Sequence, residues 1–381
     1  MKTRRFLMTT LCSLMLGIGF AGCSDSEFDN YENEFGKNPE EEAQHRGIYV
    51  LNEGLWRANN ANISGFVYNV NSNEINALGD LYKKENLVQM GDVANGMVEE
   101  DNMIYVVLNN SKYVGKLDLH CKEEARYTIP TGEGEPRCID VEDDFLYVTH
   151  YGGQVSKINV KDMTLAGTFK GGDNLEGVVE KNGKLYVANS YAVDGSNNWI
   201  YNDEVFVIDA KTMTLEKTLK VTCNPTKIYE FHDKIYVLSQ GNYADVPAVL
   251  QSIDPASGVV TRILSTENVS KVTEADNKLI YGVRAAYDAN WNPINTFFIC
   301  TTKVDEVSET SFLKDAPEEL KTSTIYMLEV DEETGFIYVG TTSKYTTYPT
   351  NGTIYQFDKN GKLLRQFDSG GINPSAMVFI D

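Results

Sequence analysis

The sequence predicts an all-β fold, a seven-bladed β-propeller built from four-stranded antiparallel blades. The first observation is a short apolar segment with a central tyrosine, such as KLYVANS or KIYVLSQ, that recurs seven times at spacings of 39 to 57 residues. The second is that other strand-like segments surround each copy, and no segment has helical periodicity. Units of this length bury a continuous core only when they stack as a ring or a solenoid. The repeated tyrosines are Tyr49, Tyr105, Tyr147, Tyr186, Tyr236, Tyr281 and Tyr338.

Residues 1–22 precede the fold and are predicted to be a lipoprotein signal peptide. Three basic residues among the first five come before an apolar stretch that is too short to span a bilayer, and small residues then lead to Cys23. The ending FAGC resembles a bacterial lipobox, although leucine is usual where Phe20 stands. We therefore expect acyl chains on Cys23 and a stable lipid anchor. The alternative is a plain signal peptide with a chance cysteine.

Residues 23–46 are predicted to be the lipidated cysteine followed by a disordered tether. The run SDSEFDNYENEFGKNPEEEAQ carries eight acidic residues against one lysine, so it cannot bury enough apolar surface to fold. Acidic residues directly after a lipidated cysteine resemble a surface-export signal of some Gram-negative bacteria. We expect an outer-membrane protein displayed at the cell surface, with a simple solvated spacer as the alternative.

The charge of the remaining chain excludes several classes of partner. Without the signal peptide, 31 Lys and Arg face 55 Asp and Glu, a net charge near −24. Nucleic-acid binding requires a basic surface, so this class is excluded, and binding to anionic lipid is disfavoured. No CxxC or Cys/His spacing indicates a metal site, and we expect buried free thiols. The cysteines after Cys23 are Cys121, Cys138, Cys223 and Cys300.

Residues 47–381 are predicted to form the propeller, with four strands in each repeat. One blade reads in order as an inner strand PRCIDVED, the tyrosine strand FLYVTHYG, a second strand VSKINV and an outer strand MTLAGTFK. The chain begins its first blade at Gly47 with a tyrosine strand that has no inner strand before it. The C-terminal GINPSAMVFID is an inner strand with nothing after it. Pairing these two strands is predicted to close the ring, which leaves only short edges.

The variable connections after the tyrosine strands are predicted to carry the function. All three tryptophans, Trp56, Trp199 and Trp291, fall in these connections, which share one face of the ring. Turns need Gly, Asn and Asp for backbone reasons but not tryptophan, so the aromatics indicate a ligand platform. The alternative is that single aromatics cap the blade below them. Residues 190–203 are expected to form a long loop over the axial funnel, with Tyr191, Trp199 and Tyr201 as contacts.

The full set of predicted ligand-binding residues is drawn from this face, by position in the connections. They are Trp56, Asn110, Arg137, His150, Tyr151, Glu176, Tyr191, Trp199, Tyr201, Tyr243, Arg284, Tyr287, Trp291, Tyr345 and Tyr348.

Catalysis is not expected. Of the four histidines only His150 lies on the predicted face, and a metal site would need clustered histidines or carboxylates. No GxSxG, HExxH or EF-hand motif occurs. Glu53, Glu176 and Asp203 are plausible carboxylates of the face, but the sequence does not pair them as acid and base. We expect no enzyme, no catalytic cofactor and no metal. A propeller enzyme and a protein-docking module remain as alternatives.

The blades resemble the YncE-like or surface-layer propeller class, whose repeats run as Pro-x-x-I, LYVAN and VxVID. Pro136, Pro225 and Pro374 start inner strands, and LYVAN occurs at 185–189. With the lipobox, the acidic tether and the aromatic loops, the chain is similar to cobalamin-binding surface lipoproteins of the BtuG type. This resemblance implies cobalamin, or a related corrinoid, as a bound ligand and a TonB-dependent outer-membrane transporter as partner. We also expect a monomer when the protein is soluble. A surface glycan-binding propeller is the alternative, since tryptophan and tyrosine also stack on sugars.

Overall fold

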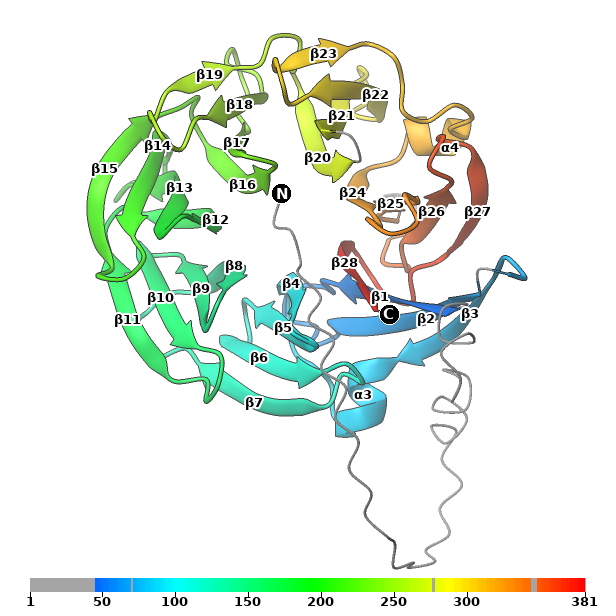
Figure 1. Ribbon diagram of the computed structural model, residues 1–381, viewed down its shortest axis with the longest axis horizontal. Coiled ribbons are helices and arrows are strands. Elements are labelled where there is room, and N and C mark those ends of the chain that lie inside the picture. The colour runs from blue at the N-terminus through cyan, green and yellow to red at the C-terminus, as the bar shows by residue number, and fades with distance from the viewer. Residues whose placement is uncertain (1–44, 70, 276–277, 344–347, 381) are drawn as a thin grey trace, which may run out of the picture.

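The computed structural model describes residues 45–380, apart from 70, 276–277 and 344–347. Its strands form seven four-stranded antiparallel sheets, arranged as blades around a central axis (Figure 1). This confirms the predicted all-β, seven-bladed propeller. The predicted signal peptide, Cys23 and nearly all of the predicted tether lie outside the described residues. In the described part of the chain, no helix has the length and apolar character needed to cross a bilayer.

Each blade places its strands in sequence order from the axis outward, except for the inner strand of the first blade. The first blade consists of β28 (Pro374–Ile380), β1 (His45–Asn52), β2 (Asn62–Asn69) and β3 (Glu74–Asp80). The second consists of β4 (Ala94–Glu100), β5 (Met103–Leu108), β6 (Tyr113–Asp118) and β7 (Glu123–Thr128). The third consists of β8 (Pro136–Glu142), β9 (Phe145–His150), β10 (Gln154–Asn159) and β11 (Leu165–Lys170). The fourth consists of β12 (Asn174–Lys181), β13 (Lys184–Val193), β14 (Trp199–Asp209) and β15 (Thr214–Lys220).

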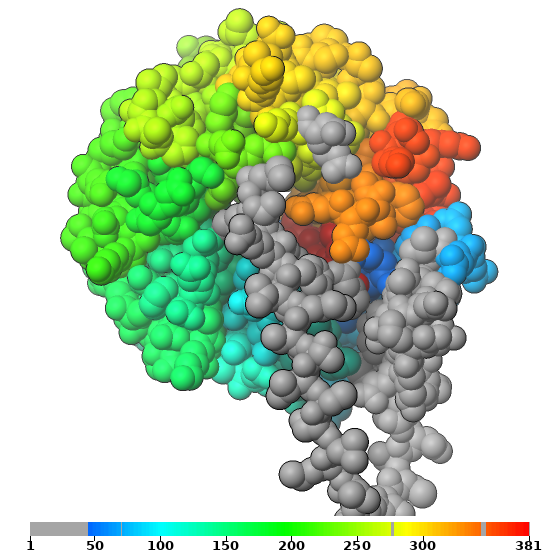
Figure 2. Space-filling view, in the orientation of Figure 1, coloured from blue at the N-terminus to red at the C-terminus, as the bar shows by residue number. Residues whose placement is uncertain are grey.

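The remaining three blades follow the same order. The fifth consists of β16 (Pro225–Phe231), β17 (Lys234–Ser239), β18 (Val249–Ile253) and β19 (Val260–Arg262). The sixth consists of β20 (Val269–Ala275), β21 (Leu279–Tyr287), β22 (Pro293–Thr301) and β23 (Glu306–Ser308). The seventh consists of β24 (Ile325–Val330), β25 (Ile337–Thr341), β26 (Thr353–Phe357) and β27 (Leu363–Asp368). In the space-filling view the colours follow one another around the ring, so each blade lies between its neighbours in sequence (Figure 2).

The first blade closes the ring by joining the two ends of the propeller. β28 pairs antiparallel with β1, with Gly47 opposite Ile380 and Tyr49 opposite Val378. This confirms the predicted closure. β1 begins at His45, two residues before the predicted boundary.

A buried ion pair reinforces the closure between the first and seventh blades. The Nε and Nη2 atoms of Arg46 donate to the two carboxylate oxygens of Asp331, at 3.0 and 2.7 Å. The Arg46 side chain is 10% exposed and that of Asp331 is 1% exposed. A bidentate guanidinium–carboxylate pair satisfies both charges where little solvent reaches them.

The repeated tyrosine fills the space between adjacent blades. Six of the seven tyrosines are buried, and Tyr281 is half-buried. The hydroxyl of Tyr49 donates to the carbonyl of Leu119 in the next blade, at 2.8 Å. The ring therefore contributes apolar burial while the hydroxyl finds a partner across the interface, which explains why this position is tyrosine rather than phenylalanine.

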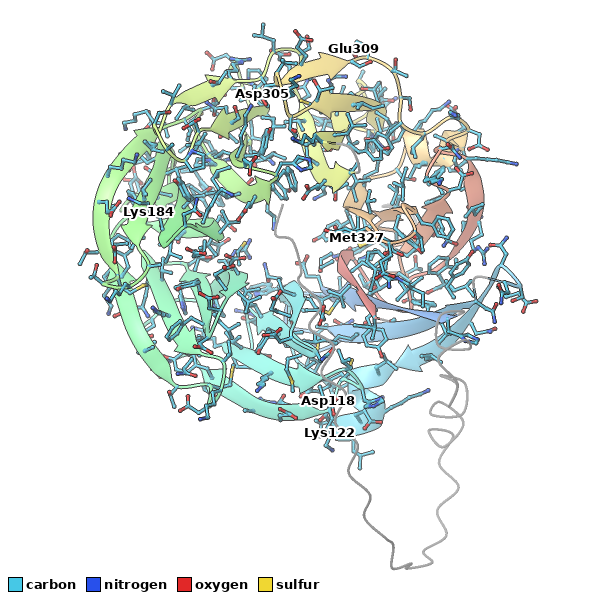
Figure 3. The ribbon with its side chains drawn as sticks, viewed as in Figure 1. Asp118, Lys122, Lys184, Asp305, Glu309 and Met327 are labelled. Carbon is cyan, nitrogen blue, oxygen red and sulfur yellow. The ribbon has the colours of Figure 1, made fainter. Side chains whose placement is uncertain are left out.

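Asp305 shows how polar groups join two blades. It lies in the turn before β23 of the sixth blade (Figure 3) and accepts from three donors of the fifth blade. These are the Nζ of Lys234 at 2.8 Å, the hydroxyl of Tyr236 at 3.1 Å and the hydroxyl of Ser252 at 2.7 Å. One carboxylate thus holds the fifth and sixth blades together.

Two short helices lie in connections from an outer strand to the next inner strand, where the sequence predicted none. They are α3 (Leu81–Asn86) and α4 (Glu318–Lys321). In α3, Asp80 caps the first turn by accepting from the Lys83 amide, and Leu81 and Tyr82 are buried against the blades. Both helices are too short to produce a recognisable helical period.

The four cysteines of the propeller are free thiols: Cys121 and Cys300 are buried, and Cys138 and Cys223 are half-buried.

Candidate ligand-binding face

One edge of the ring carries an unusual set of exposed aromatic side chains. It consists of the connections β1–β2, β5–β6, β9–β10, β13–β14, β17–β18, β21–β22 and β25–β26 with the strand ends that flank them, together with the segments leading into each inner strand. We call this edge the aromatic face. Trp56, Trp199 and Trp291 all lie on it and are 65%, 58% and 82% exposed. Tyr243, Tyr287 and Tyr348 are also exposed there.

The segment 190–203 is a strand hairpin and not the long loop that the sequence suggested. β13 and β14 stay paired as far as Val193 and Trp199, and Tyr191 lies opposite Tyr201. Only residues 194–198 form the turn. Aromatic and β-branched residues facing one another favour continued pairing, which outweighs the loop-like composition of the turn itself. The hairpin therefore projects as a stiff ribbon beyond the blade.

The sixth blade projects a second ribbon with the same turn chemistry. In the DGSNN turn, the Asp194 carboxylate accepts from the amides of Ser196 and Asn198 at 2.8 and 2.9 Å. In the DANWN turn of β21–β22, the Asp288 carboxylate accepts from the amides of Asn290 and Asn292 at 2.8 and 2.9 Å. Both aspartates thus fix the turn by an Asx-type cap.

The fourth residue of each turn adopts a left-handed backbone conformation. Asn197 occupies this place in the first turn with φ 63°, and Trp291 occupies it in the second, also with φ 63°. Asparagine tolerates this conformation, whereas a bulky residue is strained there. A strained and exposed tryptophan contributes little to the stability of the fold.

Aromatic rings connect the third, fourth and fifth blades across the face. Tyr191 stacks on Trp199, with ring centroids 4.5 Å apart and planes inclined by 17°. Tyr151 meets Tyr191 edge-on at 5.9 Å, and Tyr201 meets Tyr243 edge-on at 5.7 Å. These contacts order the side chains while their outer surfaces stay exposed, so the face offers preformed apolar area.

A polar cluster lies at the base of these aromatic rings. The Nε of Arg137 donates to Glu176 at 3.1 Å, and the hydroxyl of Tyr151 donates to the other oxygen of that carboxylate at 3.0 Å. The Arg137 guanidinium also lies 4.7 Å from the centre of the Tyr151 ring. Burial and the Glu176 charge raise the pKa of Tyr151, so its phenol stays protonated. Three predicted site residues are thus brought together by their own contacts.

Three other predicted residues, Asn110, Arg284 and His150, form no hydrogen bond with this cluster in the part of the chain that the structure describes. The side-chain amide of Asn110 donates to the Asp92 carboxylate, and Arg284 forms an ion pair with Glu309 at 3.0 Å. His150 is fully buried at the end of β9, and burial lowers the pKa of its imidazole to about 4. The ring is therefore neutral and lies below the surface of the face. Tyr345 lies outside the described residues.

The carboxylates that the sequence singled out each have a different hydrogen-bond or ion-pair partner. Glu176 is bound to Arg137, and Asp203 forms an exposed ion pair with Lys220 at 2.7 Å. Glu53 accepts a hydrogen bond from the Tyr326 hydroxyl, and burial raises its pKa. In the described part of the chain, no group of three or more His, Cys, Asp or Glu side chains is placed to hold a metal ion.

Sequence reasoning missed the residues nearest the axis. Tyr326, Lys227 and Lys271 belong to inner strands, and their charges or hydrogen bonds act on Glu53. Each stands second or third in its strand, as Arg137 and Glu176 do. This common position in the repeat is the signal that could have identified them.

Comparison with known proteins shows the fold alone. No protein-family model matches the chain, and neither does any curated protein sequence. The chain is similar to the computationally designed Ika8 protein, with 12% identity and a TM-score of 0.53 over 86% of this chain and 89% of that one. A chain of the mitotic checkpoint complex gives 12% identity and a TM-score of 0.52 over 87% and 96%. Streptogramin B lyase gives 12% and 0.51 over 72% and 82%.

Proposed function

We propose that the protein binds cobalamin or a related corrinoid on the aromatic face and passes it to a TonB-dependent outer-membrane transporter. In this proposal it is a non-enzymatic lipoprotein, anchored through Cys23 in the outer membrane and exposed at the cell surface. Cobalamin is the bound ligand and not a catalytic cofactor. The observation that carries the proposal is the set of three exposed tryptophans on stiff connections at one edge of the ring.

The chemistry of a corrinoid suits this face. Its faces and edges are apolar over an area that matches several aromatic rings, and its rim of amides can bond with Asn, Tyr and carboxylate groups. A neutral ligand is not repelled by a chain of net charge −21. Ordered rings such as the Tyr191–Trp199 stack lose little conformational freedom on binding, so more of the contact energy appears as affinity.

The experiment is a calorimetric titration of the purified protein with cyanocobalamin, followed in parallel by the visible corrin spectrum. We expect saturable one-to-one binding that Trp199→Ala weakens at least tenfold. The matched control is Val259→Ala, which removes an exposed apolar side chain from the β18–β19 turn at the opposite edge of the ring. No heat and no spectral change at high protein concentration would overturn the corrinoid assignment.

Carbohydrate is the ligand that a negative result would favour, because stacked tryptophan and tyrosine also bind sugars. A glycan array probed with Trp199→Ala and Val259→Ala distinguishes a glycan ligand from a corrinoid ligand. Binding to polysaccharide that Trp199→Ala abolishes, with no response to cyanocobalamin, would assign the face to glycans.

A further inference from the structure

Two lysines lie on neighbouring inner strands next to the axis. Lys227 is on β16 and Lys271 is on β20, both strands bordering the centre of the ring (Figure 1). Lys227 is nevertheless exposed, so solvent reaches this part of the axis. The positive charge of Lys227 acts on Lys271, and both lysines act on Glu53 and Glu329. Lys227 and Lys271 each stand third in their strands, directly after the same register shift, so both lie at one level beside the axis, which we call the axial space.

The path of Lys227 places its ammonium group in front of the inner strands. Its Nζ lies 3.9 Å from the Sγ of Cys138 on β8, two blades away. The intervening inner strand, β12, has Gly177 beside the Lys227 backbone, and a Cβ at Gly177 would come within 2.5 Å of the Ile228 nitrogen. The glycine permits this close approach of β16, and the lysine side chain then extends past β12 to Cys138 on β8.

Neither lysine is neutralised by an ion pair in the part of the chain that the structure describes. Other lysines that join adjacent blades do have a carboxylate within 4 Å, as Lys181 has in Glu230 and Lys234 has in Asp305. The Nζ of Lys271 lies 5.6 Å from the centre of the Tyr326 ring. Lys227 is exposed and Lys271 is half-buried, so an ammonium group without a carboxylate partner is available to an anion here, and burial makes it costly to leave Lys271 unpaired.

The carboxyl groups that share the space compensate the lysines only in part. Burial raises the pKa of Glu329 to about 7. Burial also raises the pKa of Glu53, which accepts a hydrogen bond from the Tyr326 hydroxyl. Burial and the charge of Lys227 lower the pKa of Lys271 to about 8. The raised pKa values of these carboxyl groups leave less negative charge beside the two lysines near neutral pH than fully ionised carboxylates would.

We propose that this axial space is a binding site for an oxyanion of the phosphate or carboxylate class, held between the ammonium groups of Lys227 and Lys271. Charge-assisted hydrogen bonds from two ammonium groups select an anion with at least two oxygens. The oxyanion is either a small free anion or the anionic arm of a molecule that occupies the aromatic face. The site does not depend on the identity of the ligand on that face.

The test is a calorimetric titration of the purified protein with inorganic phosphate. We expect saturable binding that Lys227→Met and Lys271→Met each weaken at least tenfold, and that Glu329→Gln strengthens because it removes an opposing charge. Lys211→Met is the matched control, since this lysine is exposed in the β14–β15 turn, and it should bind as the wild type does. Lys227→Arg keeps the charge and should retain binding, which separates the charge from any packing effect.

Two results would overturn the proposal. One is the absence of saturable phosphate binding by the wild-type protein. The other is equal binding by Lys227→Met, Lys271→Met and Lys211→Met, which would place the anion elsewhere. Competition then identifies the source of the oxyanion: a phosphate-bearing corrinoid that displaces phosphate occupies the site with its own arm, whereas independent binding assigns the site to a free anion. If the protein binds phosphate but not cyanocobalamin, the proposed anion site is supported and the proposed corrinoid function is wrong.

Discussion

Replacing Trp291 with asparagine tests whether the aromatic face is built at a cost to stability. Trp291 holds φ 63°, the same value as Asn197 at the matching place of the other projecting turn. Relief of the left-handed strain on a bulky residue is worth about 1–2 kcal/mol. The substitution loses contacts worth about 1 kcal/mol, since Trp291 is 82% exposed and its ring centre lies 6.3 Å from that of Tyr287. We expect Trp291→Asn to be more stable by about 0.5 kcal/mol.

The assay is urea denaturation of the variant and the wild type, paired with the cyanocobalamin titration. We expect the denaturation midpoint to rise slightly while affinity for the corrinoid falls about tenfold, since an exposed aromatic anchor is lost. The reverse substitution, Asn197→Trp, is the matched control and should destabilise the protein by about 1 kcal/mol. A loss of more than 1 kcal/mol for Trp291→Asn, with ligand affinity unchanged, would refute the reasoning and make Trp291 a packing residue.

Three further predictions concern the closure, the buried histidine and the hairpin. Arg46→Met leaves the Asp331 carboxylate buried without its bidentate partner and should lower the free energy of unfolding by about 3 kcal/mol; a loss below 1 kcal/mol would mean that the β1–β28 pairing closes the ring alone. The pKa of His150 is about 4 in the folded protein and near 6.5 in the unfolded chain. At pH values between about 4 and 6.5, the imidazole is therefore protonated in the unfolded chain and neutral in the folded protein. Stability should therefore fall by up to about 3 kcal/mol as the pH drops from 6.5 to 4, and His150→Gln should flatten this part of the profile; an unchanged profile would contradict the assignment. Replacing residues 191–201 with a two-residue turn should leave the denaturation midpoint close to that of the wild type and weaken corrinoid binding at least tenfold, whereas collapse of the fold would show that the hairpin is structural.

The repeat explains why so much of the fold could be predicted from the sequence. The tyrosine at the centre of each apolar strand packs between blades, so its spacing gives the number of blades. The first blade lacks an inner strand before Gly47, and the C-terminal segment is an inner strand with no blade of its own. These two features predicted the pairing of β28 with β1 that closes the ring. The edge of the ring that carries Trp56, Trp199 and Trp291 followed from strand order alone, because alternate connections of a blade lie on the same side.

The remaining features depend on contacts that a single segment does not encode. Val193 and Ile200 continue the β13–β14 pairing, but they flank an Asp, Gly and Asn cluster that is typical of a loop. His150 is the last residue of the tyrosine strand β9, and only the packing around this strand shows that its ring is buried. Lys227 reaches Cys138 because β12 has a glycine between them, which is a relation among three blades.

The measurement that tests the account most directly is the titration of the purified protein with cyanocobalamin, in wild-type form and with Trp199→Ala. The account predicts saturable one-to-one binding by the wild type and at least a tenfold loss in the variant. Absence of binding by the wild type, or equal binding by the variant, would contradict the assignment of the aromatic face as a corrinoid site.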